Sequence, residues 1–101
     1  MVNRNYKVVI DIDAKKSLRE AYNFIKKDSP QNAEKVKQEI LFSIKELANN
    51  PQKYPLDKYR IDNDASYRAF ELHRYRISYV VSPTQIRVIR IRHTKMNPLD
   101  Y

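Results

Sequence analysis

Residues 67–79 have the sequence YRAFELHRYRISY, and a single turn in the middle of this stretch accounts for its pattern. If His73-Arg74 is a two-residue turn, the apolar residues on its two sides face each other across an antiparallel pair of strands. His is among the residues other than Gly that tolerate the positive φ such a turn requires. The stretch therefore predicts a β-hairpin that buries one face. The residues on that face are Phe70, Leu72, Tyr75 and Ile77.

Three strands are expected in the second half of the chain, namely Tyr67–Leu72, Tyr75–Val81 and Gln85–His93. Ser82-Pro83-Thr84 is expected to turn the second strand into the third. The last strand breaks strict alternation at Val88-Ile89, which predicts either a β-bulge or a strand covered on both faces. Residues 51–66 are rich in Pro, Asp and Asn and predict a loop before the strands.

One strand and two helices are expected in the first half of the chain. Residues 6–12 alternate as a strand does, and Asp13 is a candidate N-cap for a helix that ends near Asp28. Ser29-Pro30 predicts the start of a second helix, with Ser as the N-cap and Pro at the first helical position. Asn49-Asn50-Pro51 is expected to end that helix, with Asn in the left-handed conformation that Gly usually takes.

The two helices are expected to form an antiparallel hairpin, because the link between them is very short. Each helix carries an apolar stripe that needs a second surface to cover it. We therefore expect one α+β domain, residues 1–101, in which an N-terminal strand, the helical hairpin and a three-stranded antiparallel meander follow one another. The helices pack on one face of this small sheet and leave the other face open. The stripes are Ala14, Leu18, Ala21, Tyr22 and Ile25 in the first helix, and Ala33, Val36, Ile40, Ile44 and Leu47, widened by Leu41 and Phe42, in the second.

The composition of the 101-residue chain excludes several classes of protein. It has no Gly, which rules out phosphate-binding loops, dinucleotide-binding turns and nucleophile elbows, because these need Gly at close backbone approaches. It has no Cys and only two His, so we expect neither thiol catalysis nor a metal, and no cofactor. No segment approaches the roughly 18 apolar residues of a membrane span, and no signal peptide is visible. We expect a soluble, cytoplasmic protein without membrane contact.

The formal net charge of +8 predicts an anionic partner, such as nucleic acid, the ribosome or an acidic protein. Nine of the eleven Lys lie in residues 1–57, whereas seven of the nine Arg lie in residues 58–101. Guanidinium groups on strands suit phosphates, carboxylates and aromatic rings, so these Arg are candidates for holding a nucleic-acid backbone. The alternative is an open sheet face kept soluble by Arg in cross-strand pairs. The strand residues concerned are Arg68, Arg76, Arg87, Arg90 and Arg92.

Arg76 and His93 each leave two interpretations open. The hairpin register places Arg76 opposite Glu71 on the open face. If Arg76 is paired there it is a sheet residue, and if it points past Glu71 into a cleft it is a phosphate ligand. His93 ends the last strand, next to two Arg, and is a candidate acid or base. A single His at a strand end is more often structural.

Five stretches of the chain, taken in their order and spacing, carry a family resemblance: LREAYNFI (18–25), SPQNA (29–33), NP (50–51), YRAFELHRYRISY (67–79) and VIRIRHT (88–94). They resemble the RelE/ParE superfamily of toxins from type II toxin–antitoxin modules, and the resemblance extends from Ala14 to Pro98. It implies the topology already expected from the periodicity. It also implies a small acidic antitoxin as the cognate partner.

The resemblance implies one of two targets. RelE-like members cleave mRNA on the ribosome without a metal, whereas ParE-like members poison DNA gyrase and lack a defined catalytic set. For mRNA cleavage, Arg76 matches the phosphate-stabilising position and His93 matches the acid or base of some members. The residues implied or predicted to bind substrate phosphates are Arg68, Arg90, Arg92, Lys95 and Tyr101.

We expect a toxin that inhibits growth by metal-independent, ribosome-dependent mRNA cleavage, because Arg76 and His93 can be given chemical roles in it. The first alternative is a ParE-like poison of DNA gyrase with no catalysis of its own. The pattern of the helical hairpin, the Ser-Pro junction and the Arg-Ala-Phe strand is closer to ParE-like members. The second alternative is a non-toxic nucleic-acid-binding or assembly module.

Overall fold

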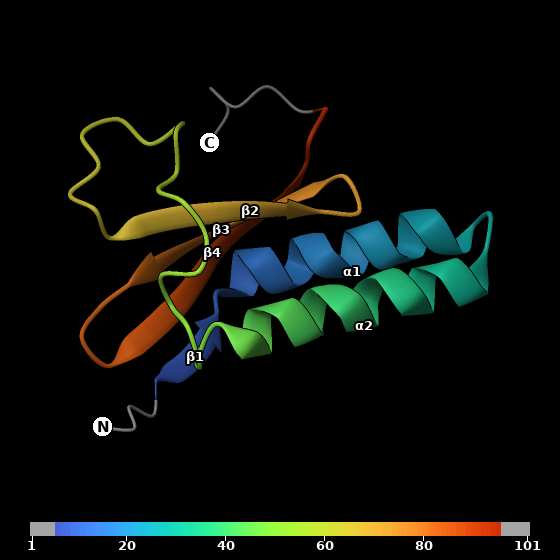
Figure 1. Cartoon of the computed structure of the whole chain (residues 1–101). Coiled ribbons are helices and arrows are strands. Elements are labelled where there is room, and N and C mark those ends of the chain that lie inside the picture. Colours follow the sequence, from blue (N-terminus) through green and yellow to red (C-terminus); the bar gives the residue numbers. More distant parts are fainter. Residues whose placement is uncertain (1–5, 96–101) are drawn as a thin grey trace.

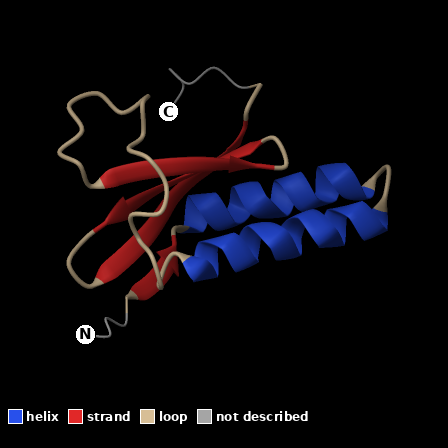
Figure 2. Cartoon of the chain, viewed as in Figure 1, coloured by secondary structure: helices blue, strands red, loops and turns tan. Residues whose placement is uncertain are grey.

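The computed structural model describes residues 6–95, which form a four-stranded sheet with two helices on one face (Figures 1 and 2). The strand order is β1-β4-β3-β2, with β1 parallel to β4 and the other neighbours antiparallel. The expected α+β fold, with a helical hairpin packed on one face of a small sheet, is confirmed. The other face, which was expected to be open, is partly covered, because Ala69, Arg76 and Ser78 on that face are buried. In chain order the elements are β1 (Lys7–Ile10), α1 (Ile12–Lys26), α2 (Pro30–Glu46), β2 (Tyr67–Leu72), β3 (Tyr75–Val81) and β4 (Gln85–His93).

The β2–β3 hairpin has the predicted strands, register and turn. Leu72 faces Tyr75 across the pair, and the register continues without interruption to the start of β2. His73 and Arg74 both have positive φ, at 54° and 69°. Two positive φ values in a two-residue turn match the right-handed twist of the flanking strands. His73 Nε2 also lies 2.6 Å from a carboxylate oxygen of Glu39, so the turn contacts α2.

The irregularity predicted in the last strand is a β-bulge. Ser78 pairs with Arg90, but the next residue of β3, Tyr79, pairs with Val88, so Ile89 is the extra residue of β4. A bulge shifts the alternation of the strand by one position. Both Val88 and Ile91 can therefore face the helices, and both are buried.

The start of α1 differs from the prediction. The strand β1 ends at Ile10 and Asp11 is the N-cap, so a strand through Ile12 and a cap at Asp13 are wrong. The Asp11 backbone N–H donates to the Val88 carbonyl at 2.9 Å, which ends the ladder there. Asp13 lies in the first turn, where a carboxylate interacts well with the helix dipole. Ile12 becomes the first helical residue and is 81% exposed.

The predicted start of α2 is confirmed, but its predicted end is wrong in detail. Ser29 is the N-cap, its Oγ accepts the Asn32 N–H at 3.1 Å, and Pro30 is the first residue. The helix ends at Glu46, and neither Asn49 nor Asn50 has a positive φ. The chain after Glu46 instead continues in hydrogen-bonded turns, in which the Asn49 N–H donates to the Glu46 carbonyl at 3.0 Å.

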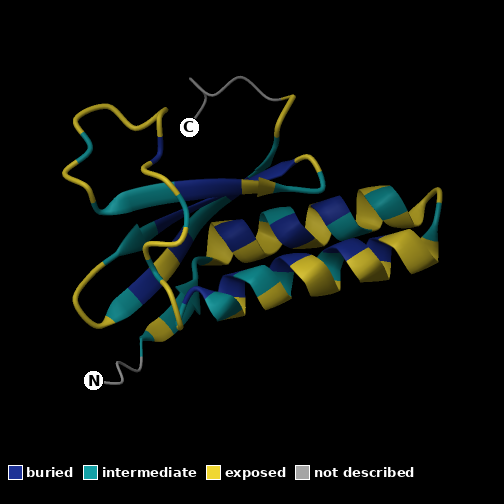
Figure 3. Ribbon diagram, in the orientation of Figure 1, coloured by how far each residue is buried: buried dark blue, intermediate teal, exposed yellow. Residues whose placement is uncertain are grey.

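The core lies between the helical hairpin and the facing side of the sheet (Figure 3). Most of the predicted stripe residues are buried, but Phe42 is 64% exposed and does not belong to the core. Tyr79 is completely buried, and its hydroxyl donates to the Pro51 carbonyl at 2.9 Å. The buried stripe residues are Ala14, Leu18 and Ala21 of α1, together with Ala33, Val36, Ile40 and Ile44 of α2 and Leu47 just after it.

Arg74→Gly is expected to raise the free energy of unfolding by about 0.5–1 kcal/mol, because Gly adopts a positive φ without crowding from a Cβ atom. Thr84→Gly in the next turn is the matched control, since no described residue of that turn has a positive φ. There Gly should lower stability by about 0.5–1 kcal/mol through the entropy of the unfolded chain. Urea unfolding measures both changes, and an Arg74 variant no more stable than the wild type would contradict the argument.

Burial raises the pKa of the Tyr79 hydroxyl to about 12. In the unfolded chain a Tyr ionises near pH 10. The protonated, buried phenol therefore contributes stability that is complete below pH 10 and is lost as the pH rises toward 12. Tyr79→Phe should cost about 1 kcal/mol at pH 7 through the lost hydrogen bond. Its stability should then fall less steeply than that of the wild type above pH 10, as measured by urea unfolding at several pH values. Equal slopes would argue against a buried neutral phenol.

Candidate functional site

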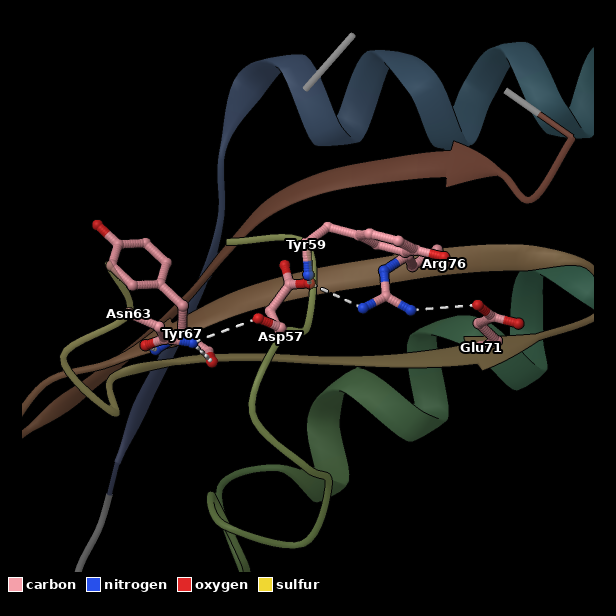
Figure 4. A network of polar contacts seen from close by, with 6 residues as sticks. All are labelled: Asp57, Tyr59, Asn63, Tyr67, Glu71 and Arg76. Atoms are coloured by element: carbon pink, nitrogen blue, oxygen red, sulfur yellow. Dashed lines mark hydrogen bonds and ion pairs between the residues drawn. The ribbon is translucent and has the colours of Figure 1, made fainter. Parts of the chain in front are cut away.

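Arg76 of β3 is the best-buried cation of the sheet and joins the open face to the loop before β2 (Figure 4). Its Nη2 donates to Asp57 Oδ1 at 2.8 Å, and its Nη1 donates to Glu71 Oε2 at 3.1 Å. The side chains of Arg76 and Asp57 are 10% and 5% exposed, whereas that of Glu71 is 50% exposed. The ring of Tyr59 covers the guanidinium at 4.6 Å. Arg76 thus holds two carboxylates and an aromatic ring at once.

The predicted pair between Arg76 and Glu71 is confirmed, but the more deeply buried partner, Asp57, was not predicted. Asp57 belongs to a loop, and its bond spans 19 residues of sequence, so no periodicity links it to the strand. The one available signal is that the segment after Pro55 puts a lone carboxylate between apolar and basic residues. That pattern alone does not identify a partner.

The loop of residues 51–66 is fixed along the outer edge of β2. The Asp57 N–H donates to the Tyr67 carbonyl at 2.9 Å, and the Ala69 N–H donates to the Pro55 carbonyl at 3.3 Å. The side-chain amide of Asn63 donates to the same Tyr67 carbonyl at 2.8 Å. The loop therefore covers an edge that would otherwise expose unpaired backbone groups.

His93 lies on the helix side of the sheet. It pairs with Tyr75, and their rings meet edge to face with centroids 5.1 Å apart. Its Nδ1 accepts the Lys95 N–H at 3.1 Å, so Nε2 carries the proton when the ring is neutral. The adjacent pair, Arg76 with Arg92, points to the other side because neighbouring residues of a strand alternate. The structure does not bring Arg76 and His93 together.

The predicted phosphate-binding residues are likewise divided between the two faces of the sheet. Arg90 and Arg92 share the open face with Arg76, since they pair with Ser78 and Arg76 across β3–β4. Arg68 pairs with Tyr79 on the helix side, and its Nη1 donates to the Tyr54 carbonyl at 2.6 Å. The other two predicted residues are Lys95 and Tyr101. Lys95 is exposed after the end of β4, and Tyr101 lies outside the described residues.

A groove of about 390 Å³ runs between α1 and the second half of β4. The strand β1 pairs only with residues 85–88, so within residues 6–95 no strand pairs with the same edge of β4 further along. The groove is amphipathic, with apolar, basic and acidic side chains along its walls. The side chains that line the groove include Phe24 and Glu20 of α1 and Arg90, Arg92 and His93 of β4.

Among residues 6–95, no group of three His, Asp or Glu side chains is placed to hold a metal ion. Neither of the two described helices combines the length and apolar character needed to cross a membrane. What the described residues offer is a basic sheet face, an amphipathic groove and a fixed loop. These features suit recognition of other macromolecules.

The two helices and four strands define a small α+β domain with surfaces for recognition, and a family comparison gives its family. The model of the ParE toxin of the type II toxin-antitoxin system, parDE, matches residues 8–98. The chain belongs to this family and is a toxin of a type II toxin–antitoxin system. A search of curated proteins finds no match.

Two solved structures show the same fold. One is from a chromosomal ParDE toxin–antitoxin system of P. aeruginosa, with a TM-score of 0.71 and 18% identity, covering 90% of this chain and 98% of that one. The other is a YoeB dimer from Staphylococcus aureus, with a TM-score of 0.56 and 14% identity, covering 88% of this chain and 97% of that one. At these identities the likeness concerns the fold.

Asp57→Ala is expected to lower the free energy of unfolding by about 2–3 kcal/mol, because it removes the more deeply buried of the two carboxylates that pair with a buried guanidinium. Glu71→Ala is the matched control and should cost less than about 1 kcal/mol, since that carboxylate is half exposed. Chemical unfolding gives both values. Hydrogen exchange at the Asp57 and Ala69 amides should also accelerate in the Asp57 variant alone. Equal costs for the two variants would refute the assignment.

Proposed function

We propose that this toxin inhibits growth by binding and poisoning DNA gyrase and that it does not cleave RNA itself. The observation that carries the proposal is the separation of Arg76 from His93. Cleavage of RNA by its own 2′-OH needs a base, a cation and an acid around one phosphate. Arg76 and His93 lie on opposite faces of the sheet, so they do not surround one phosphate.

The ion pairs of Arg76 support the same proposal. Two carboxylates and a tyrosine ring already occupy its guanidinium. A phosphate would have to displace Asp57 from a buried pair, which is costly. A binding toxin needs no such displacement, because Arg76 then serves to hold the loop in place. Membership of the ParE family supports gyrase as the target, since ParE-like toxins are the gyrase poisons of the superfamily.

We further propose an acidic antitoxin that binds the groove between α1 and β4. The net charge of +8 attracts an acidic chain, and Arg90 and Arg92 line this groove. Phe24, which is 64% exposed, offers an apolar contact in the same place. Both the antitoxin and gyrase are expected in the cytoplasm, so we propose that the protein acts there.

Ribosome-dependent mRNA cleavage stays a prediction, and one observation favours it. Arg76, Arg90 and Arg92 lie on the same face of the sheet, opposite the helices, and such a group of Arg suits an RNA backbone. The predicted acid or base, His93, and the tail residues Lys95 and Tyr101 belong to that hypothesis. A non-toxic nucleic-acid-binding or assembly module is the remaining alternative, and harmless expression without an antitoxin would support it.

Two assays with the purified toxin separate these hypotheses. We expect inhibition of gyrase supercoiling with accumulation of cleaved DNA, and no new stops in toeprinting on translating ribosomes. His93→Ala should keep growth inhibition within about twofold of the wild type, because the ring contacts Tyr75 and lines the groove proposed for the antitoxin, not a surface proposed to contact gyrase. A ribosome-dependent cut that disappears in the His93 variant, with gyrase unaffected, would overturn the proposal.

A further inference from the structure

Residues 56–61 form the most exposed apolar segment of the loop before β2. Ile61 is 83% exposed, and Leu56 and Tyr59 are 44% and 41% exposed. In Figure 3 most of this loop is coloured as exposed, and it stands out beyond the start of β2. Large apolar side chains grouped on a protein surface mark sites of interaction. Ile61 in particular has almost its whole side chain in solvent.

The segment is held rigidly although it is exposed. Asp57 is anchored by Arg76 and by its backbone bond to β2. Directly after Ile61 the chain takes a positive φ at Asp62, 55°, and again at Ala65, 77°. Neither residue is Gly, so both conformations cost energy. The loop thus contains strained backbone and still leaves Ile61 in solvent. This combination is more typical of a loop that binds a partner than of one that only connects two elements.

The exposed charges within residues 56–61 are positive, although the exposed carboxylates of Asp62 and Asp64 follow and Asp64 interacts with Arg60. Its one acidic residue, Asp57, is turned inward and neutralised by Arg76, with its side chain 5% exposed. Lys58 and Arg60 are exposed, and each lies over a tyrosine ring, Tyr59 and Tyr67 respectively. The outward surface of residues 56–61 is therefore apolar with two cations between the apolar side chains.

We propose that residues 56–61 dock into a protein surface of the target, an apolar recess rimmed by carboxylates. A protein fits better than a nucleic acid, because an aliphatic side chain such as Ile61 gains free energy only where apolar atoms cover it. Carboxylates at the rim complement Lys58 and Arg60. The inference rests on the proposed function, for which it names the contact surface of the toxin.

This surface is separate from the proposed antitoxin groove. The loop borders β2, whereas the groove borders β4, and β3 lies between these strands. A change in residues 56–61 should therefore reduce toxicity and leave antitoxin binding intact.

Ile61→Asp tests the proposal, and Ile12→Asp is its matched control. Ile12 is 81% exposed, so both changes place the same carboxylate on an almost fully exposed isoleucine. We expect Ile61→Asp to weaken growth inhibition by about tenfold or more, the effect typical of an interface anchor. Ile12→Asp should stay within about twofold of the wild type. Ile61→Leu should retain toxicity, and Lys58→Glu should weaken it.

Thermal unfolding of each full-length variant, together with its co-purification with the co-expressed antitoxin, shows that the fold and the groove are intact. Ile61→Asp as toxic as the wild type would overturn the proposal, as would an equal loss in the Ile12 variant. The identity of the target is tested separately from the docking surface. If the wild type leaves purified gyrase active while the two isoleucine variants still differ in toxicity, the gyrase proposal fails and the docking surface stands.

Discussion

The buried ion pair between Arg76 and Asp57 is the interaction on which the arrangement of the surfaces depends. It joins the start of β3 to a loop 19 residues earlier in the chain. A charge in a protein interior is stable only if a partner neutralises it, so each residue fixes the position of the other. The pair keeps the loop against β2, covers that edge of the sheet, and turns the only carboxylate of residues 56–61 away from solvent.

The absence of Gly shapes the same region. Every reversal in the chain has to be made by residues with a Cβ atom, and four described residues accept a positive φ. Two of them, His73 and Arg74, form the hairpin turn, where the hydrogen bonds of two strands compensate for the strain. The other two, Asp62 and Ala65, lie in the loop that Arg76 anchors. Residues with a positive φ therefore occur where the surrounding contacts stabilise the strained backbone.

Because side chains alternate along each strand, the two faces of the sheet carry different candidate functional residues. On the face away from the helices, the Arg76 side chain meets two carboxylates, a tyrosine ring and the anchored loop. On the helix face, His93 meets Tyr75. Side chains that are close in sequence and suggest one catalytic site are therefore on different surfaces. Binding surfaces do not require such convergence, so a fold of this kind can recognise a target and an antitoxin on separate sides of one small sheet.

The sequence by itself determined the elements, their order and the hairpin register. Periodicity and turn chemistry are local, and the His73-Arg74 turn fixes which residues face each other. The prediction from the sequence was wrong where Asp11 and Asp13 are both candidate N-caps of α1. A backbone hydrogen bond from Asp11 to Val88 decides where β1 ends, and this bond is not visible in the sequence. Only the tertiary structure decided that Asp57 binds Arg76 and that Arg76 and His93 lie apart. The first contact has no sequence period, and the second depends on the register in which β3 pairs with β4, which residues far apart in the sequence set together.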